Sequence, residues 1–150
     1  MHFQVEDTAV ATLASSAAHS WGTLIACLFR GSSTPPHCEA MLRDPLPDRG
    51  CTLGPGFADA VLQALRVNPA VHDGAMMLRL LPQTGRYVLC GWSYRLFPPS
   101  GARTSIVNRG SAFNSCISMS LVERVDCLYL VSNGSVTKFR NGEHDQPTMC

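Results

Sequence analysis

Short apolar runs bounded by turn residues predict the strands of this chain. The first of them, WGTLIACLFRG, is a continuous apolar segment that ends in Arg-Gly, which is typical of a buried strand. The predicted strands are 21–31, 74–81, 86–93, 126–132 and 135–142. PQTG separates the second and third runs, and Asn133-Gly134 separates the last two. Each pair therefore predicts a β-hairpin, and Asn-Gly favours a type I′ turn in the latter.

Three other segments predict helices. Segment 7–20 has small apolar residues at helical spacing, with Thr8 as its expected N-cap. Segments 54–69 and 111–125 are amphipathic, and the helix in the former is expected to stop before Pro69. Their apolar stripes are Phe57, Val61 and Leu65 in 54–69, and Phe113, Ile117 and Leu121 in 111–125.

The remaining segments predict the connections. Residues 32–50 are rich in proline and serine and are expected to be irregular, whereas 94–110 forms a long loop of a kind that is often functional. The tail 143–150 is expected to be loose. With no internal repeat and no linker, residues 1–150 predict one α/β domain. Its mixed central sheet has about five or six strands flanked by helices, because there are too few strand–helix–strand units for a regular doubly wound fold.

Composition narrows the functional classes. The chain has 150 residues, of which 45% are apolar and 15% charged, so it can bury a sizeable core. With 12 basic and 11 acidic residues, it lacks the positive charge that nucleic-acid binding requires. No apolar run reaches membrane-spanning length and the first twenty residues do not read as a secretory signal, so we expect a soluble, cytoplasmic protein without membrane contact.

The cysteines are expected to be buried apolar residues in a reducing compartment. There are seven, an odd number, and none forms a Cys-x-x-Cys pair. His37-Cys38 together with Cys51 could contribute to a metal site, but their spacing matches no zinc pattern.

One short stretch, VHDGAMML, carries residues capable of chemistry. His72 and Asp73 lie between a predicted helix and a buried strand, where an imidazole and a carboxylate can share a divalent metal ion. The carboxylate can also take a proton from a hydroxyl group. Gly74 would allow a ligand or another backbone segment to approach closely. The alternative is a simple turn whose His and Asp face solvent.

NPAVHDGAMML resembles the segment of diadenylate cyclase domains that contains their Asp-Gly-Ala motif, including the preceding His. The resemblance continues in order over roughly residues 21–143. WGTLIACLF resembles an early strand of that family, and GCTLGPGFADAVLQAL the helix that leads to the motif. SLVERVDCLYLVSNGSVTKFRNG resembles the closing segment.

This resemblance implies a diadenylate-cyclase-like fold and a nucleotide site. In that family two ATP molecules are condensed to cyclic di-AMP across the face of a dimer of domains. Asp73 would then be the catalytic residue, which helps to bind Mg²⁺ or Mn²⁺ and activates a 3′-hydroxyl, with His72 as a further metal ligand. Gly74 and Ala75 would contact the nucleotide.

The second motif of the family, Gly-Thr-Arg-His-Arg, is not present. The matching positions, 112–116, read AFNSC, so both arginines and the His are absent and Phe113 replaces the Thr. Losing an arginine removes both a charge and a bidentate donor. The acidic residues that follow Val-Ser in the family are also replaced, by Asn133-Gly134.

Other residues could hold phosphates in place of the missing motif. Arg109 and Ser111 flank a predicted helix start, which favours an anion, and Asn114 and Ser115 follow on that helix. The long loop adds two further arginines, and three aromatic residues near it could stack on a base, although such aromatics are more often core or loop anchors. These are Arg95 and Arg103, and Trp92, Tyr94 and Phe97.

Three functions are compatible with the sequence. The first is a nucleotide-binding domain without cyclase activity that senses ATP or a cyclic dinucleotide and signals through a separate effector protein or a homo-oligomer. The second is an active nucleotidyltransferase that makes cyclic di-AMP, or a related product, with Mg²⁺ or Mn²⁺. The third is an interaction module without a ligand. Retention of Asp73 disfavours the third, and loss of the arginine motif disfavours the second.

Overall fold

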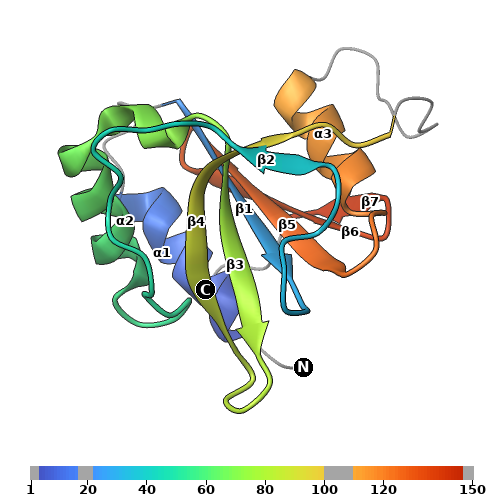
Figure 1. Cartoon of the computed structure of the whole chain (residues 1–150), viewed down its shortest axis with the longest axis horizontal. Helices are drawn as coiled ribbons and strands as arrows, with labels where there is room; N and C mark the ends of the chain where they lie inside the picture. The colour runs from blue at the N-terminus through green and yellow to red at the C-terminus, as the bar shows by residue number, and fades with distance from the viewer. Residues whose placement is uncertain (1–3, 17–21, 100–109, 147–150) are drawn as a thin grey trace.

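A mixed β-sheet runs through the residues that the computed structural model describes, which are 4–16, 22–99 and 110–146 (Figure 1). Within these residues its strands are β1 (Thr23–Phe29), β2 (Cys38–Ala40), β3 (Ala75–Leu81), β4 (Arg86–Leu96), β5 (Val125–Ser132), β6 (Ser135–Arg140) and β7 (Glu143–Asp145). Their order in space is β2-β4-β3-β1-β5-β6-β7. β1 and β3 are parallel, and every other neighbouring pair is antiparallel.

Helices cover both faces of this sheet. The described helices are α1 (Val5–Ser16), α2 (Phe57–Val67), the 3₁₀ helix η1 (Pro69–His72) and α3 (Ser111–Met119). α1 and α2 pack on one face and α3 on the other (Figure 1). The architecture is therefore α/β with a mixed central sheet flanked by helices, as the sequence predicts. No helix within the described residues combines the length and the apolar composition needed to cross a lipid bilayer.

The central strand β1 explains why the sheet has a core on each side. Successive strand side chains point to opposite faces. Leu24 and Leu28 therefore join the core beneath α1 and α2, whereas Cys27 and Phe29 join the core beneath α3. All four are almost fully buried, which accounts for the continuous apolar run in the sequence.

The predicted strands and hairpins are confirmed, and two further strands appear where none was expected. Asn133 and Gly134 have φ angles of 52° and 78°, as a type I′ turn requires. β2 lies within the connection expected to be irregular, and β7 lies within the tail expected to be loose. Both are three-residue edge strands with mostly exposed side chains, so no apolar pattern marks them. They form because β4 and β6 offer unpaired edges.

Two helix boundaries differ from the prediction. α1 begins at Val5, so Thr8 is a residue of the helix and not its N-cap, and its N–H donates to the carbonyl of Gln4 at 3.2 Å. Residues 17–20, predicted to continue this helix, lie outside the described residues. The helix predicted over 111–125 ends at Met119, and Leu121 is 54% exposed.

Side-chain hydrogen bonds explain why α3 ends early. The Ser120 hydroxyl donates to the carbonyl of Ile117 at 2.6 Å and accepts the N–H of Gly142 at 2.9 Å. A serine hydroxyl that bonds a backbone carbonyl of the preceding turn competes with helical hydrogen bonding. The contact with Gly142, which is 22 residues away, is invisible to a local pattern.

Cysteine burial agrees with expectation in part, since three of the six described cysteines are buried and three are half-buried. Cys27 and Cys127 are buried and Cys90 is half-buried, and burial raises the pKa of each of these thiols. The described cysteines are all free thiols. Within the described residues, no group of three or more His, Cys, Asp or Glu side chains is arranged to hold a metal ion.

Candidate functional site

The turn between η1 and β3 is built by local hydrogen bonds. α2 ends at Val67, and the extended backbone of the next residue, Asn68, lets its side chain cap η1 by accepting the N–H of Ala70 at 3.1 Å. The Asn68 amide donates in turn to the carbonyl of Pro45 at 2.9 Å. The N–H of Asp73 closes η1 by donating to the Ala70 carbonyl. Asp73 is thereby held immediately before the first residues of β3.

Gly74 adopts a conformation that other residues would occupy only under strain. Its φ is +87°, and a Cβ atom at this position would lie 2.8 Å from the carbonyl carbon of Ser93 and 2.9 Å from the Met41 methyl group. The following residue, Ala75, is fully buried and pairs with Ile25 on one side and Tyr94 on the other. Glycine is therefore required here for packing against β4, independently of any ligand.

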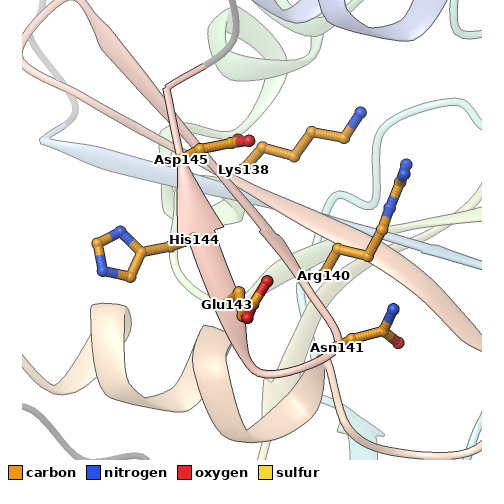
Figure 2. Close-up of a pocket in the computed structure, with 6 residues that line it drawn as sticks. All are labelled: Lys138, Arg140, Asn141, Glu143, His144 and Asp145. Carbon is orange, nitrogen blue, oxygen red and sulfur yellow. The ribbon is translucent and has the colours of Figure 1, made fainter.

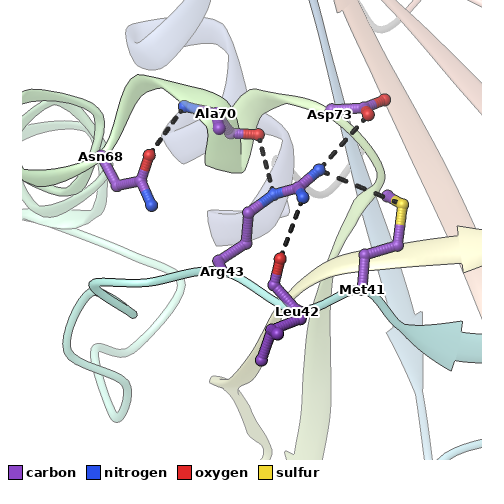
Figure 3. A network of polar contacts seen from close by, with 6 residues as sticks. All are labelled: Met41, Leu42, Arg43, Asn68, Ala70 and Asp73. Atoms are coloured by element: carbon purple, nitrogen blue, oxygen red, sulfur yellow. Dashed lines mark hydrogen bonds and ion pairs between the residues drawn. The ribbon is translucent and has the colours of Figure 1, made fainter.

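Arg43 is the closest charged partner of Asp73 (Figure 3). Its Nη2 lies 3.3 Å from Asp73 Oδ2, and its Nε and Nη1 donate to the carbonyls of Ala70 and Leu42 at 3.2 and 3.0 Å. The Arg43 side chain is 18% exposed, whereas that of Asp73 is 68% exposed. The turn therefore presents a carboxylate to solvent with a well-anchored guanidinium beside it.

Two buried polar atoms near this turn lack a hydrogen-bond partner among the described residues. They are His72 Nδ1 and Ser93 Oγ. Ser93 has a φ of +58°, and its backbone is the surface against which Gly74 packs. Unpaired buried polar groups and left-handed non-glycine residues both cost stability, and strained backbone of this kind clusters at functional sites. The role of His72 as a metal ligand stays a prediction.

α3 carries the positions that match the missing arginine motif. Phe113 and Cys116 are buried in the core under α3, together with Ala75 of β3. Asn114 and Ser115 are half-buried and Ser111 is exposed at the start of the helix. The Asp-Gly-Ala turn and α3 thus share one face of the sheet through Ala75. Arg109 lies outside the described residues, as does Arg103.

The aromatic residues considered as base-stacking groups have different surroundings. Trp92 is 2% exposed, and its Nε1 donates to the carbonyl of Asp48 at 3.0 Å, which identifies it as a core residue. Tyr94 is half-buried on β4, and burial raises the pKa of its hydroxyl. Phe97 is exposed and meets the ring of His37 edge-on. Arg95, on the same strand, is exposed.

A polar hollow of about 220 Å³ lies along β6 and β7, apart from the Asp73 turn (Figure 2). His144 points to the opposite side of β7 from Arg140 and packs edge-on against Phe113, with ring centroids 4.9 Å apart (Figure 2). Lys138 is already engaged, since its Nζ lies 2.9 Å from both Asp7 and Gln4. This hollow therefore offers fewer free charges than its residue types suggest. Its lining is Lys138, Arg140, Asn141, Glu143, His144 and Asp145.

Comparison with known proteins gives the fold a name. No family model and no curated protein sequence matches the chain. Among solved structures, DacA from Staphylococcus aureus, a diadenylate cyclase crystallised as a double-cysteine mutant, superposes with a TM-score of 0.57 at 12% identity. The match covers 96% of this chain and 87% of DacA. The chain has a diadenylate-cyclase-like fold.

A second solved structure supports the same fold assignment. A hypothetical membrane spanning protein from Bacillus cereus superposes on this diadenylate-cyclase-like domain with a TM-score of 0.62 at 14% identity. The match covers 93% of this chain but 62% of the Bacillus protein. Identities this low establish the fold and leave the activity to be argued from the site.

Arg43 is the site residue that sequence reasoning missed. It lies 30 residues before Asp73, in a proline-rich connection without periodic pattern. The sequence around an isolated arginine in such a segment does not indicate which residue it contacts. The ion pair with Asp73 is therefore evident only in the folded chain.

Proposed function

We propose that this diadenylate-cyclase-like domain binds a nucleotide or cyclic nucleotide at the Asp73 turn and senses it without cyclase chemistry. The proposal is carried by one observation: the side chain of Asp73, in the turn before β3, is 68% exposed while Arg43 contacts its carboxylate from one side. A fixed, exposed carboxylate can accept hydrogen bonds from ribose hydroxyls. The ligand, bound next to α3, would signal to a separate effector protein or to a second copy of the chain.

The residues around the turn favour binding over turnover. Phosphoryl transfer depends on cations that surround the phosphates. Positions 112–116 supply none, and two of these side chains, Phe113 and Cys116, are buried in the core. Arg43 is a cation at the turn, but its guanidinium is already bonded to two carbonyls and to Asp73. It can add positive charge at the site without being free to follow a moving phosphate.

A divalent ion fits this turn as part of a nucleotide complex. Mg²⁺ is commonly held by one or two carboxylates, with the substrate's phosphates and water completing its coordination. Asp73 offers an exposed carboxylate of this kind. Mg²⁺ or Mn²⁺ would there supply positive charge to bound phosphates, which is the property that positions 112–116 lack.

Binding is tested by thermal unfolding of the full chain with ATP or cyclic di-AMP, each with and without Mg²⁺ or Mn²⁺. We expect at least one ligand to raise Tm, because a ligand at about 100 times its Kd stabilises the fold by about 2.7 kcal/mol. Asp73→Asn should remove the shift while preserving side-chain shape. Glu123→Gln is the control, because it removes a negative charge from an exposed turn residue elsewhere in the chain. This variant should keep the rise in Tm that the ligand causes.

The products of incubation with ATP distinguish the alternatives. We expect chromatography to show unchanged ATP. A cyclic dinucleotide that disappears with Asp73→Asn would establish an active nucleotidyltransferase and refute the sensor. If no nucleotide changes the Tm, the proposal of ligand binding is contradicted. An interaction module without a ligand is then the remaining function.

A further inference from the structure

A cavity of about 580 Å³ lies between α1 and the start of α2, away from the Asp73 turn. The turn lies beyond the last residue of α2, whereas the cavity is lined by that helix's first residues. Val5, Ala9 and Ala58 form its apolar wall. Small-molecule sites typically measure roughly 300–1,000 Å³ and combine apolar walls with a few polar groups. The cavity has the size and composition of such a site.

Two opposite charges line this cavity without pairing to each other. They are Arg86, at the start of β4, and Asp59, in the first turn of α2. Within the part of the chain that the structure describes, neither side chain takes part in a hydrogen bond or ion pair. Arg86 is half-buried, and its Nη1 lies 3.2 Å from where a Cβ of Gly54 would be. A larger residue at 54 would crowd the guanidinium.

The guanidinium of Arg86 lines the cavity without a protein partner among the described residues, so it is free to pair with the carboxylate of a bound ligand. Arginine and carboxylate form bidentate, charge-assisted hydrogen bonds. A simple fatty acid would satisfy Arg86 but would bring no positive group to Asp59. A nucleotide phosphate, with several negative charges, would be repelled by Asp59. The complementary ligand carries one carboxylate, one ammonium group and an apolar body.

We propose that this cavity binds an apolar amino acid or a dipeptide of such residues. The ligand's carboxylate pairs with Arg86, its ammonium group faces Asp59, and its side chain packs against Val5 and Ala9. The ligand bridges α1, the first turn of α2 and the start of β4. This binding is independent of the nucleotide proposed for the Asp73 turn.

Calorimetry with the full chain tests this inference with four probes: leucine, leucyl-leucine, N-acetyl-leucine and leucinamide. We expect saturable binding of leucine or leucyl-leucine at micromolar to millimolar concentration. N-acetyl-leucine lacks the ammonium group and leucinamide lacks the carboxylate, so each should bind at least about tenfold more weakly. Equal binding of leucine and its two derivatives, or no binding of leucine and leucyl-leucine at millimolar concentration, would overturn the proposal.

Variants locate the site. Arg86→Gln should weaken binding of the favoured probe about tenfold or more, whereas Arg95→Gln, which removes an exposed guanidinium outside the cavity, should not. Thr12→Trp, at an exposed lining residue, should block the cavity without changing a charge. Asp73 does not line the cavity, so Asp73→Asn should leave amino-acid binding unchanged. The test of amino-acid binding therefore stays valid even if the nucleotide proposal fails. Binding that survives both Arg86→Gln and Thr12→Trp would refute this location.

Discussion

The guanidinium of Arg43 lies 3.3 Å from the carboxylate of Asp73 and ties the loop after β2 to the turn before β3. The same guanidinium donates to carbonyls on both sides of this junction, those of Leu42 and Ala70. Arg43 therefore has a structural function that does not depend on Asp73. The exposed carboxylate, by contrast, contributes little to packing and is free to meet a ligand.

This asymmetry predicts different effects of removing the two partners. Asp73→Asn should change the free energy of unfolding by less than about 1 kcal/mol, because exposed ion pairs contribute little. Arg43→Gln should cost about 1–2 kcal/mol, because two carbonyls also lose their donor. Urea unfolding of both variants measures the difference. A larger loss from Asp73→Asn would show that the carboxylate is mainly structural.

Gly74→Ala should be strongly destabilising, by about 2–4 kcal/mol. Its positive φ strains any side chain, and the new methyl group would meet the Ser93 backbone at 2.8 Å. Gly85→Ala is the matched control, since φ is +70° and nothing lies within 4 Å of the new Cβ. It should cost only about 1 kcal/mol. If urea unfolding shows similar losses of stability for Gly74→Ala and Gly85→Ala, the contact with Ser93 does not contribute to the cost.

Ser93→Gly should stabilise the protein by about 1 kcal/mol. The substitution relieves a φ of +58° and removes a buried hydroxyl without a partner among the described residues, and together these exceed the entropic cost of glycine. Ser132→Gly, in β5, is the control, because Ser132 is half-buried and its φ is not positive. This substitution should destabilise the protein. A loss of stability in Ser93→Gly would show that its hydroxyl makes a favourable interaction, for instance with buried water.

Asp7 should be important for docking α1 on the sheet. Its carboxylate accepts hydrogen bonds from the Tyr129 hydroxyl and from Lys138, whose side chain is only 11% exposed. Asp7→Leu should cost about 3 kcal/mol or more, because it leaves a buried ammonium group without its carboxylate. Adding Lys138→Met should recover part of this loss in urea unfolding. An additive double mutant would show that the two charges are not coupled.

Alkaline pH should destabilise the protein partly through Cys127. Burial raises the pKa of this thiol from 9.0 to about 11, so the folded state binds its proton more tightly than the unfolded state does. Its contribution is fully present below pH 9 and is lost as pH rises towards 11. Cys127→Ala should therefore flatten the fall in stability over this range by about 2–3 kcal/mol.

Val131→Ala is the control for the cavity that Cys127→Ala creates, because Val131 is a buried residue of the same strand and core. It should lower stability at every pH and leave the profile parallel to that of the unaltered protein. Urea midpoints across the alkaline range provide the measurement. Parallel profiles for both variants would contradict a shifted thiol at position 127.

The Asp73 turn illustrates how far sequence reasoning reaches at the site. The motif located an Asp and a flexible Gly between helix and strand, and the structure places both there. The sequence predicts that Gly74 allows a ligand or another backbone segment to approach closely. In the structure the segment that approaches is the backbone of Ser93. Arg43 and Arg86 gave no signal, because the importance of each depends on neighbours distant in the chain.

By itself, the sequence determined the α/β class, the main strands, the two hairpins and the amphipathic helix α2. Each follows from burial periodicity or turn chemistry within about ten residues, which a local pattern records. Tertiary structure alone decided that β1 lies between a parallel β3 and an antiparallel β5, and that two short segments become edge strands. It also decided that Arg43 reaches Asp73 and that Arg86 lines a cavity beside α1. Such contacts depend on which faces and edges remain unpaired once the helices and strands have packed together.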